Sequence, residues 1–263
     1  MSDLVDHRLE RDGAVATIVF DRPAAYNAVT GAMLLSLQAT MKALARDREV
    51  RAIVLTGAGK AFCAGQALDD AQTMSEGNGR PDLLRAVMER FNPLVIAIAT
   101  IEKPVIAAVN GVAAGAGMGI ALAADFRFVA ASASFTTAFA KIGLVPDSGV
   151  SFFLPRMVGY ARALELTLLS EKIDAARANE LGLVTRLCAD DVLAQAQAFA
   201  ATLAQGPRSL GLIKRELIQN GLGDLRAALT YEAQLQAIAG DSADFIEGVS
   251  AFREKRQPHF CGE

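Results

Sequence analysis

The chain has 263 residues, of which 52% are hydrophobic and 21% charged, and its formal net charge is -3. A chain of this composition can bury enough apolar surface to offset the entropy lost on folding, so intrinsic disorder is excluded. The acidic balance gives no overall basic field to hold nucleic acid or anionic lipid, although a local basic patch for phosphate groups stays open. The length fits one large domain, or one domain with a small appendage.

Cysteine and histidine are scarce. Cys63, Cys188 and Cys261 are odd in number and lack CxxC spacing, which argues against a disulfide framework and favours a reducing compartment. The two histidines, His7 and His259, lie near opposite ends of the sequence and offer little material for a His-based triad or a metal site. The first ten residues are charged, unlike a secretory signal. We therefore expect a cytoplasmic protein that binds no metal.

An uncharged stretch over residues 104–124 is long enough to cross a bilayer. However, Asn110 and Gly111 form a turn signal in its middle, and three further glycines follow closely. The stretch also lacks the flanking Trp or Tyr anchors that are typical of membrane interfaces. We expect a buried strand here, followed by a helix that opens near Gly117, and no membrane span.

Short apolar runs alternate with helical periodicity over the first two thirds of the chain. Strands are predicted over residues 14–20, 51–56, 104–109 and 126–130, and helices after Thr30 and over residues 81–100. This alternation is typical of an α/β fold whose sheet is covered on its faces. From Tyr160 onward the pattern is helical, and this last third either covers the sheet or packs on a neighbouring subunit.

Two glycine-containing loops, over residues 57–66 and 110–119, follow predicted strands. Such loops can aim backbone N–H groups at a ligand, or they can be plain tight exits from a strand. A dinucleotide fingerprint fits poorly, because Ile120 stands at its third glycine position and no acidic residue lies about twenty positions further on. Neither loop ends in the Gly-Lys-Ser/Thr sequence of a phosphate-binding P-loop.

Several motifs follow one another in order along nearly the whole chain. They are Asp21-Arg22-Pro23 with Asn27, residues 55–65, residues 103–125, residues 143–156 and residues 247–252. Together they resemble the crotonase, or enoyl-CoA hydratase/isomerase, superfamily. Within it, residues 91–95, 113–117 and 242–252 are most similar to the bacterial isomerases that act on ring-epoxidised phenylacetyl-CoA.

The resemblance implies an α/β fold with a crotonase-like ββα spiral core, placed over residues 1–195. Residues 196–263 would form a helical C-terminal segment that packs at an oligomer interface. A homotrimer or a dimer of trimers is the assembly that the family implies. The implied substrate is an acyl-CoA thioester, whose coenzyme A is part of the substrate, so no separate cofactor, nucleic acid or membrane partner is expected.

In this superfamily two backbone N–H groups donate to the thioester oxygen, where negative charge develops in the transition state. By motif match these groups belong to Gln66 and Ala116, the second at the opening of a helix, where an anion is favoured. The match also implies substrate-binding residues, namely Ala64, Ala67, Leu68, Gly115, Phe139 and Lys255. Lys255 belongs to a basic cluster that either meets the CoA phosphates or lies on a solvated helix face.

The acid–base groups depart from the hydratase pattern. A hydratase of this superfamily uses two glutamates, and the matching positions here are Gly119 and Phe139, whose side chains accept no proton. Asp147 stands where the isomerase branches carry their carboxylate, although Pro-Asp-Ser-Gly is also good turn chemistry without catalysis. One carboxylate suffices for a 1,3-proton shift, and nearby phenylalanines would desolvate Asp147 and raise its pKa. We predict an acyl-CoA isomerase with Asp147 as its base.

Three other functions stay open at this point. One is enoyl-CoA hydration, the activity that a generic family label would name. Another is hydrolysis or dehalogenation next to the thioester, in which a loop aspartate attacks the substrate directly. The third is a non-catalytic relative that binds acyl-CoA or RNA, although the acidic charge balance argues against RNA.

Overall fold

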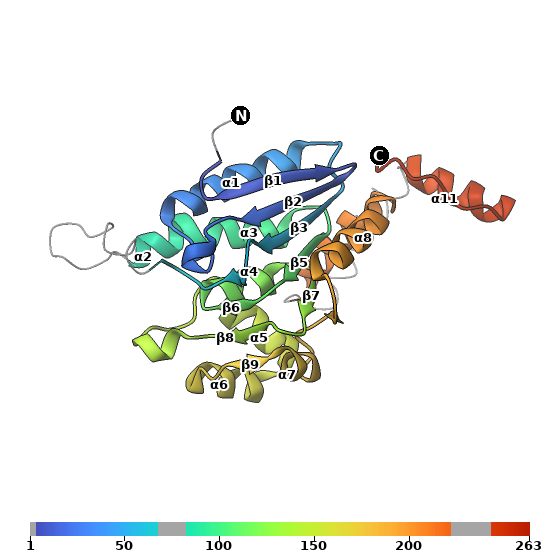
Figure 1. Cartoon of the computed structure of the whole chain (residues 1–263). Helices are drawn as coiled ribbons and strands as arrows, with labels where there is room; N and C mark the ends of the chain where they lie inside the picture. Colours follow the sequence, from blue (N-terminus) through green and yellow to red (C-terminus); the bar gives the residue numbers. More distant parts are fainter. Residues whose placement is uncertain (1–3, 68–82, 222–242) are drawn as a thin grey trace.

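The computed structural model describes residues 4–67, 83–221 and 243–263. Its large sheet has the strand order β1-β2-β3-β5-β7-β10 (Figure 1). These strands are β1 (His7–Asp12), β2 (Val15–Phe20), β3 (Ala52–Gly57), β5 (Val105–Val109), β7 (Phe126–Ala130) and β10 (Arg186–Cys188). β1 pairs antiparallel with β2, and the other neighbouring strands of this sheet are parallel. The four strands predicted from the sequence correspond to β2, β3, β5 and β7.

A second, smaller sheet has the order β4-β6-β8-β9. Its strands are β4 (Ala61–Cys63), β6 (Val112–Ala114), β8 (Ser134–Thr136) and β9 (Ile173–Asp174). β3, β5 and β7 of the large sheet are each followed along the chain by a strand of the small sheet. The chain therefore repeats a two-strand unit with helices between the units, which is the ββα spiral expected from the sequence.

Helical elements connect and cover the two sheets. They are η1 (Pro23–Ala25), α1 (Gly31–Arg46), α2 (Leu83–Ala86), η3 (Val87–Phe91), α3 (Asn92–Thr100), α4 (Ala116–Ala123), η4 (Phe139–Ile142), α5 (Val150–Val158), α6 (Tyr160–Leu169), α7 (Ala175–Glu180), α8 (Val192–Ala204), α9 (Ser209–Asn220) and α11 (Ala243–Glu254). The helix predicted over residues 81–100 corresponds to α2, η3 and α3, which follow one another without a break. Among the described residues, no helix is both long and apolar enough to cross a membrane.

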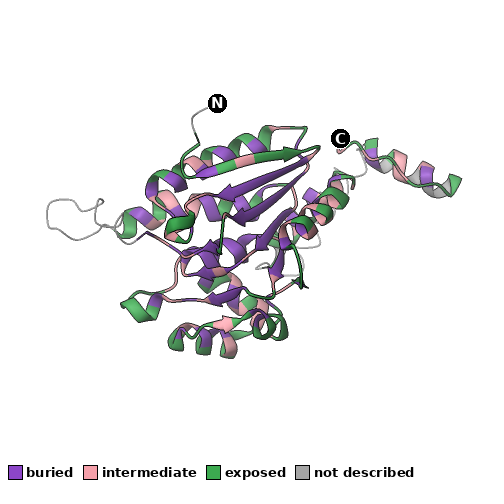
Figure 2. Ribbon diagram, in the orientation of Figure 1, coloured by how far each residue is buried: buried purple, intermediate pink, exposed green. Residues whose placement is uncertain are grey.

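The central strands of the large sheet are buried on both faces, as Figure 2 shows. Successive side chains of a strand point to opposite faces, so Ile53 and Leu55 of β3 pack into the core beneath α1, α3 and α4. Ala52 and Val54 instead pack against α8. This two-sided burial explains why β3 reads as a continuous apolar run and not as an alternating one.

Helix α1 begins where the sequence predicts. The Thr30 side chain accepts a hydrogen bond from Met33 N–H at 3.1 Å and so caps the first turn. The buried row of the helix includes Met33, Leu37, Met41 and Leu44 at helical spacing. This row faces the sheet and so holds α1 in place. The segment before α1 is thereby fixed as well, and its Val29 bonds to the first glycine loop.

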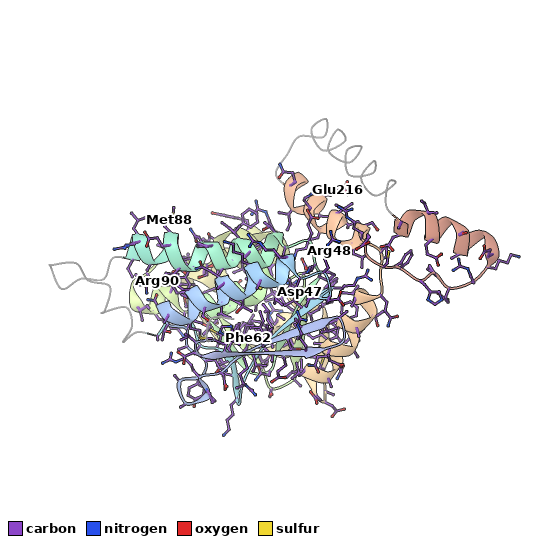
Figure 3. All side chains as sticks on the ribbon, turned by 90° about the horizontal axis from the view of Figure 1, so that it is seen from above. Asp47, Arg48, Phe62, Met88, Arg90 and Glu216 are labelled. Carbon is purple, nitrogen blue, oxygen red and sulfur yellow. The ribbon has the colours of Figure 1, made fainter. Side chains whose placement is uncertain are left out.

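The C-terminal third divides into helices with different surroundings. The expected boundary at residue 195 falls inside α8, whose Ala196 and Ala200 are fully buried against the sheet. Helix α11 projects beyond the end of α1 that is marked by Asp47 and Arg48 in Figure 3. It is tied to the body by Asp244, whose carboxylate accepts hydrogen bonds from Arg208, Cys261 and Gly262 backbone N–H groups.

Candidate active site

The first glycine loop contains β4 and turns after it at Gly65, whose φ of +99° favours glycine. Val29 N–H donates to the Gly65 carbonyl at 2.8 Å, and Ala67 N–H donates to the Val29 carbonyl at 2.9 Å. In this parallel bridge Val29 engages the residues on either side of Gln66. The N–H of Gln66 therefore points away from Val29, and the preceding Ala64 is held by its own N–H on the Tyr26 carbonyl.

The second glycine loop connects β6 to α4. Gly115 has a φ of +52°, and its N–H donates to the Thr136 carbonyl of β8 at 3.0 Å. Helix α4 starts at Ala116, so the backbone N–H groups of its first turn have no intrahelical partner. The helix start lies within one residue of the predicted one. Its N-terminus gives the loop a cluster of donors with partial positive charge.

The two loops touch each other, and glycine makes this contact possible. A Cβ atom on Gly65 would lie 3.6 Å from Ala116 N. A Cβ atom on Gly117 would lie only 2.1 Å from the Cys63 carbonyl oxygen, so α4 packs directly on the end of β4. Among the described residues, neither Gln66 N–H nor Ala116 N–H has a hydrogen-bond acceptor. Two adjacent loops thus present unengaged donors, as an oxyanion-binding site requires.

Asp147 lies in the turn between η4 and α5. The turn is sharp, because Ser148 and Gly149 both have left-handed backbones, with φ of +50° and +79°. The Asp147 carbonyl accepts the Val150 N–H at 2.9 Å, which fixes the turn to the start of α5. The Asp147 side chain is half-buried, and among the described residues no cationic side chain pairs with it.

Burial raises the pKa of Asp147 above its ordinary value, and the Ser148 hydroxyl partly opposes this by donating to Oδ1 at 2.8 Å. A carboxylate that is half-buried without a cation is a stronger base than an exposed one. Such a group suits the role of a general base.

Helix α4 brings this carboxylate to the loops. Gly119 lies one turn after Gly115, to whose carbonyl its N–H donates at 3.1 Å. A Cβ atom on Gly119 would lie 2.4 Å from the Ser148 carbonyl oxygen, so the Asp147 turn packs on the first turn of α4. Phe139 is 6% exposed, and its ring lies 3.9 Å from the place of a Gly115 Cβ atom. An apolar ring thus borders the loop that carries Ala116.

The structure therefore brings together most of the site residues predicted from the sequence. Those that lie in the two loops, in η4 or in the turn after it are Ala64, Gln66, Ala67, Gly115, Ala116, Phe139 and Asp147. Leu68 lies outside the described residues. Lys255 is exposed and directly follows α11. Figure 1 shows α11 projecting away from the elements that carry this group.

Two residues at the site had no role assigned from the sequence. Asn27 is fully buried with a φ of +57°, and its side-chain amide donates to the Ala58 and Ala61 carbonyls at 2.9 and 2.8 Å. It therefore fixes the chain where it enters β4 and the first loop. Ser148 is the second. Its position next to Asp147 was visible in the sequence, but the contact with α4 that orients it was not.

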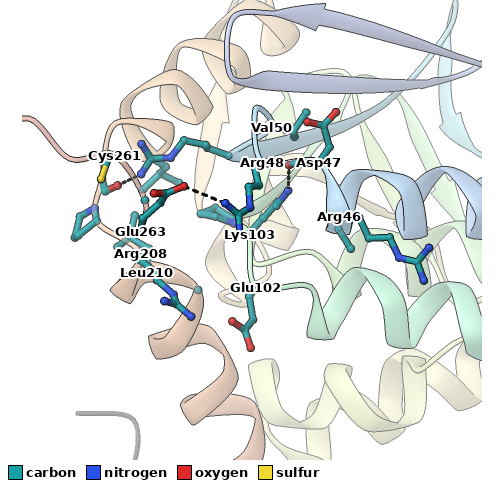
Figure 4. A pocket seen from close by; sticks show the side chains of 18 residues that line it. Arg46, Asp47, Arg48, Val50, Glu102, Lys103, Arg208, Leu210, Cys261 and Glu263 are labelled. Carbon is teal, nitrogen blue, oxygen red and sulfur yellow. Dashed lines mark hydrogen bonds and ion pairs between the residues drawn. The ribbon is translucent and has the colours of Figure 1, made fainter. Parts of the chain in front are cut away.

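A polar crevice of about 510 Å³ lies elsewhere, at the end of α1 and the N-terminal ends of β3 and β5 (Figure 4). Three of its basic side chains already have partners. Lys103 Nζ donates to the Asp47 carbonyl, Arg51 donates to the Phe260 carbonyl, and Arg48 pairs with the Glu263 carboxylate. In the part of the chain that the structure describes, no three His, Cys, Asp or Glu side chains could hold a metal ion.

A ββα spiral that joins two glycine loops to one half-buried carboxylate defines a crotonase-type fold. The chain matches the Enoyl-CoA hydratase/isomerase family over residues 10–263. It therefore belongs to the enoyl-CoA hydratase/isomerase family.

Individual relatives resemble the chain over nearly its full length. It is 44% identical to the 1,2-epoxyphenylacetyl-CoA isomerase of Escherichia coli (strain K12) over 251 residues, 95% of each chain. It is 47% identical, over 258 residues and 97% of each chain, to a Rhodobacter capsulatus protein named "Probable enoyl-CoA hydratase". A solved structure of enoyl-CoA hydratase from Bacillus anthracis superposes with a TM-score of 0.91 at 32% identity, covering 98% of this chain and 100% of that one.

Proposed function

We propose that the protein is an acyl-CoA isomerase that works through an enolate, with Asp147 as its single proton carrier. The observation that carries this proposal is the half-buried Asp147 carboxylate, which lacks a cationic partner among the described residues and packs on the helix that opens at Ala116. The positions that a hydratase would fill with glutamates are Gly119 and Phe139. Neither side chain can activate water or protonate carbon.

The proposed cycle moves one proton and changes no oxidation state. Asp147 removes a proton from the α-carbon of a 3-enoyl thioester, and the electron pair delocalises onto the thioester oxygen. The N–H groups of Gln66 and Ala116 donate to that oxygen, where a fixed donor stabilises the developing charge by about 3 kcal/mol. Protonated Asp147 then returns the proton to the γ-carbon and gives the 2-enoyl isomer. A cycle of this kind requires neither a metal nor a redox cofactor.

The acyl group that we propose is either an aliphatic 3-enoyl chain or a ring-epoxidised aromatic acyl group. The second is supported by the 44% identity to an isomerase whose name specifies 1,2-epoxyphenylacetyl-CoA. The apolar ring of Phe139 beside the second loop also fits a site from which water is excluded.

The proposed assembly is a homotrimer or a dimer of trimers. It is supported by large apolar side chains that α6 exposes in a row, since Tyr160, Leu164 and Leu168 are 75%, 44% and 65% exposed. A row of this size on a single chain is typical of a surface that a partner covers. Sedimentation velocity on the purified protein tests the proposal, and a monomer at micromolar concentration would contradict it.

A paired assay tests the proposed reaction. A 3-enoyl-CoA and a 2-enoyl-CoA are supplied separately. The products are resolved by chromatography, and their masses are determined by mass spectrometry. Migration of the double bond without added mass is the expected result. Rapid gain of one water by the 2-enoyl-CoA would overturn the proposal in favour of hydration. If neither substrate reacts, the ring-epoxidised substrate is tested next, and no reaction there would contradict isomerase function.

A further inference from the structure

Ser148 is an unusual residue within the Asp147 turn. Its side chain is 1% exposed, and its backbone φ of +50° lies in the left-handed region, which costs a residue with a Cβ atom more than it costs glycine. The neighbouring Gly149 accommodates a φ of +79° without that cost. The packing around this fully buried serine must therefore hold its backbone in the unfavourable conformation.

Helix α4 supplies those surroundings through Gly119. A Cβ atom on Gly119 would lie 2.4 Å from the Ser148 carbonyl oxygen and 2.7 Å from the Ser148 Cβ atom. Distances below 3.0 Å are not tolerated, and the atoms that would have to move belong to a backbone already fixed by the hydrogen bond from Val150 to Asp147. Any side chain at position 119 therefore displaces Ser148.

The hydroxyl of Ser148 connects this packing to the carboxylate. It donates to Asp147 Oδ1 at 2.8 Å, which leaves Oδ2 as the oxygen without a partner among the described residues. A carboxylate with one oxygen fixed by a buried hydroxyl keeps the other in a constant direction, because the donor itself cannot rotate away.

We propose that Gly119 and Ser148 form a positioning pair for Asp147. The missing side chain of Gly119 makes room for Ser148, and the Ser148 hydroxyl then orients the Asp147 carboxylate. The same contact limits the site to one carboxylate, because a glutamate at position 119 would take the space of the Ser148 backbone. This inference rests on the proposed function, and it adds that packing restricts the site to proton transfer.

Ser148 is the main polar partner of the Asp147 carboxylate among the described residues, because no charged side chain of the neighbouring elements pairs with it. The packed helices α3 and α4 contain no titratable side chain. Lys141 of η4 is exposed, and Arg156 of α5 lies 3.7 Å over the Phe152 ring. A change in the protonation of Asp147 after removal of the hydroxyl can thus be assigned to Ser148.

Two substitutions distinguish the effect of the Ser148 hydroxyl from the effect of its backbone conformation. Ser148→Ala and Ser148→Gly both remove the hydrogen bond, but only glycine relieves the left-handed backbone. Ser170→Ala is the matched control, because Ser170 is also fully buried, has a φ of +48° and donates its hydroxyl to the Thr167 carbonyl. For each variant we would measure kcat, KM and the pH profile of kcat/KM, and titrate Asp147 by carbon-13 NMR.

Both Ser148 variants are expected to raise the pKa of Asp147 further, because a donor to the charged form is lost. The acid limb of the pH profile should move upward with it, while kcat falls about tenfold and KM changes little. Ser170→Ala should lower stability and leave the pH profile in place. An unchanged Asp147 titration in both Ser148 variants would overturn the proposal. A shifted titration with an unshifted acid limb would uphold the hydrogen bond and overturn Asp147 as the base.

Gly119→Ala tests the other half of the pair. It should lower kcat by about tenfold or more, since the added Cβ atom displaces the turn that carries Asp147. Gly248→Ala is the control, because a Cβ atom on that helical glycine would lie 3.5 Å from the Phe260 ring, an ordinary contact. Wild-type kcat and an unshifted Asp147 titration in Gly119→Ala would contradict the pairing.

Discussion

Asp125 and Asp147 are two half-buried carboxylates with opposite surroundings. Asp125, between α4 and β7, accepts hydrogen bonds from Lys214 Nζ at 2.9 Å and from Val105 N–H at 2.7 Å. Asp147, between η4 and α5, accepts one from the Ser148 hydroxyl. Burial raises the pKa of both carboxyls, but only Asp125 has an ammonium group that offsets the effect.

This difference indicates that the Asp125 carboxylate stabilises the fold, whereas the Asp147 carboxylate is available for catalysis. Lys214 also donates to the Ile98 and Lys103 carbonyls, so the ion pair cross-links α9 to the end of α3 and the start of β5. Removing either charge would leave the other uncompensated in the interior. Within the described residues, the Asp147 side chain bonds to its neighbour Ser148 and cross-links no distant elements. A half-buried acid that the fold does not use is costly for stability, and such groups cluster at functional sites.

Asp147→Asn should have the largest effect on activity. We expect activity to fall by about 10³- to 10⁴-fold, the upper range for a general base, because the amide accepts no proton. The melting temperature should stay the same or rise, since the substitution removes a half-buried charge that has no cationic partner among the described residues. Enzyme assays and calorimetry measure both. Asp191→Asn, which keeps the cap of α8, is the control and should be active. Full activity of Asp147→Asn would exclude it as the base.

Lys214→Met should lower stability and leave activity in place, the opposite of Asp147→Asn. Lys214 is 8% exposed and its partner 21%, so loss of the ammonium should lower the free energy of unfolding by about 3–5 kcal/mol. Denaturant unfolding measures this change, and kcat per folded molecule should be retained. The double variant with Asp125→Asn should recover part of the loss, because no charge is left unpaired. A large fall in kcat without loss of stability would show that the pair serves catalysis.

Gly65→Ala tests the backbone donors of the first glycine loop. A Cβ atom there would lie 2.9 Å from the Ala114 carbonyl oxygen, and the φ of +99° disfavours any side chain. Displacement of the first loop should lower kcat by about 100-fold, the usual cost of one oxyanion donor. Gly13→Ala adds a side chain at a positive φ in open space, so it should affect stability alone. Equal kcat values in both variants would argue against the proposed oxyanion site.

The smallest expected effect is on pH dependence, where activity and stability should change in opposite directions. Because the folded pKa of Asp147 is raised above its ordinary value of 3.8, the folded state favours the protonated form. Its contribution to stability is therefore present at low pH and lost as pH rises through the raised pKa, whereas activity increases over the same range. The unfolding free energy of wild type minus that of Asp147→Asn should fall with rising pH in that window. A difference that rises with pH would contradict the pKa direction.

The sequence predicted the elements whose signals are local. β2, β3, β5 and β7 are apolar runs of five or six residues, and α1 has both a cap and a periodic face. The strands of the small sheet did not stand out, because β4 and β6 have three residues each and lie inside what looked like loops. Asp147 was found through its motif. The contact of Gly119 with Ser148 joins residues 29 positions apart, so only the fold shows it.

The most direct test of the central claim is α-proton exchange. Phenylacetyl-CoA has no double bond to migrate, but its α-protons can be removed and replaced if an enolate forms. We would incubate it in deuterium oxide with wild-type protein, with Asp147→Asn and without protein, and follow the mass of the recovered thioester. We expect enzyme-dependent deuterium uptake with wild type and only the protein-free rate with Asp147→Asn. Equal uptake by the two proteins would contradict the role of Asp147.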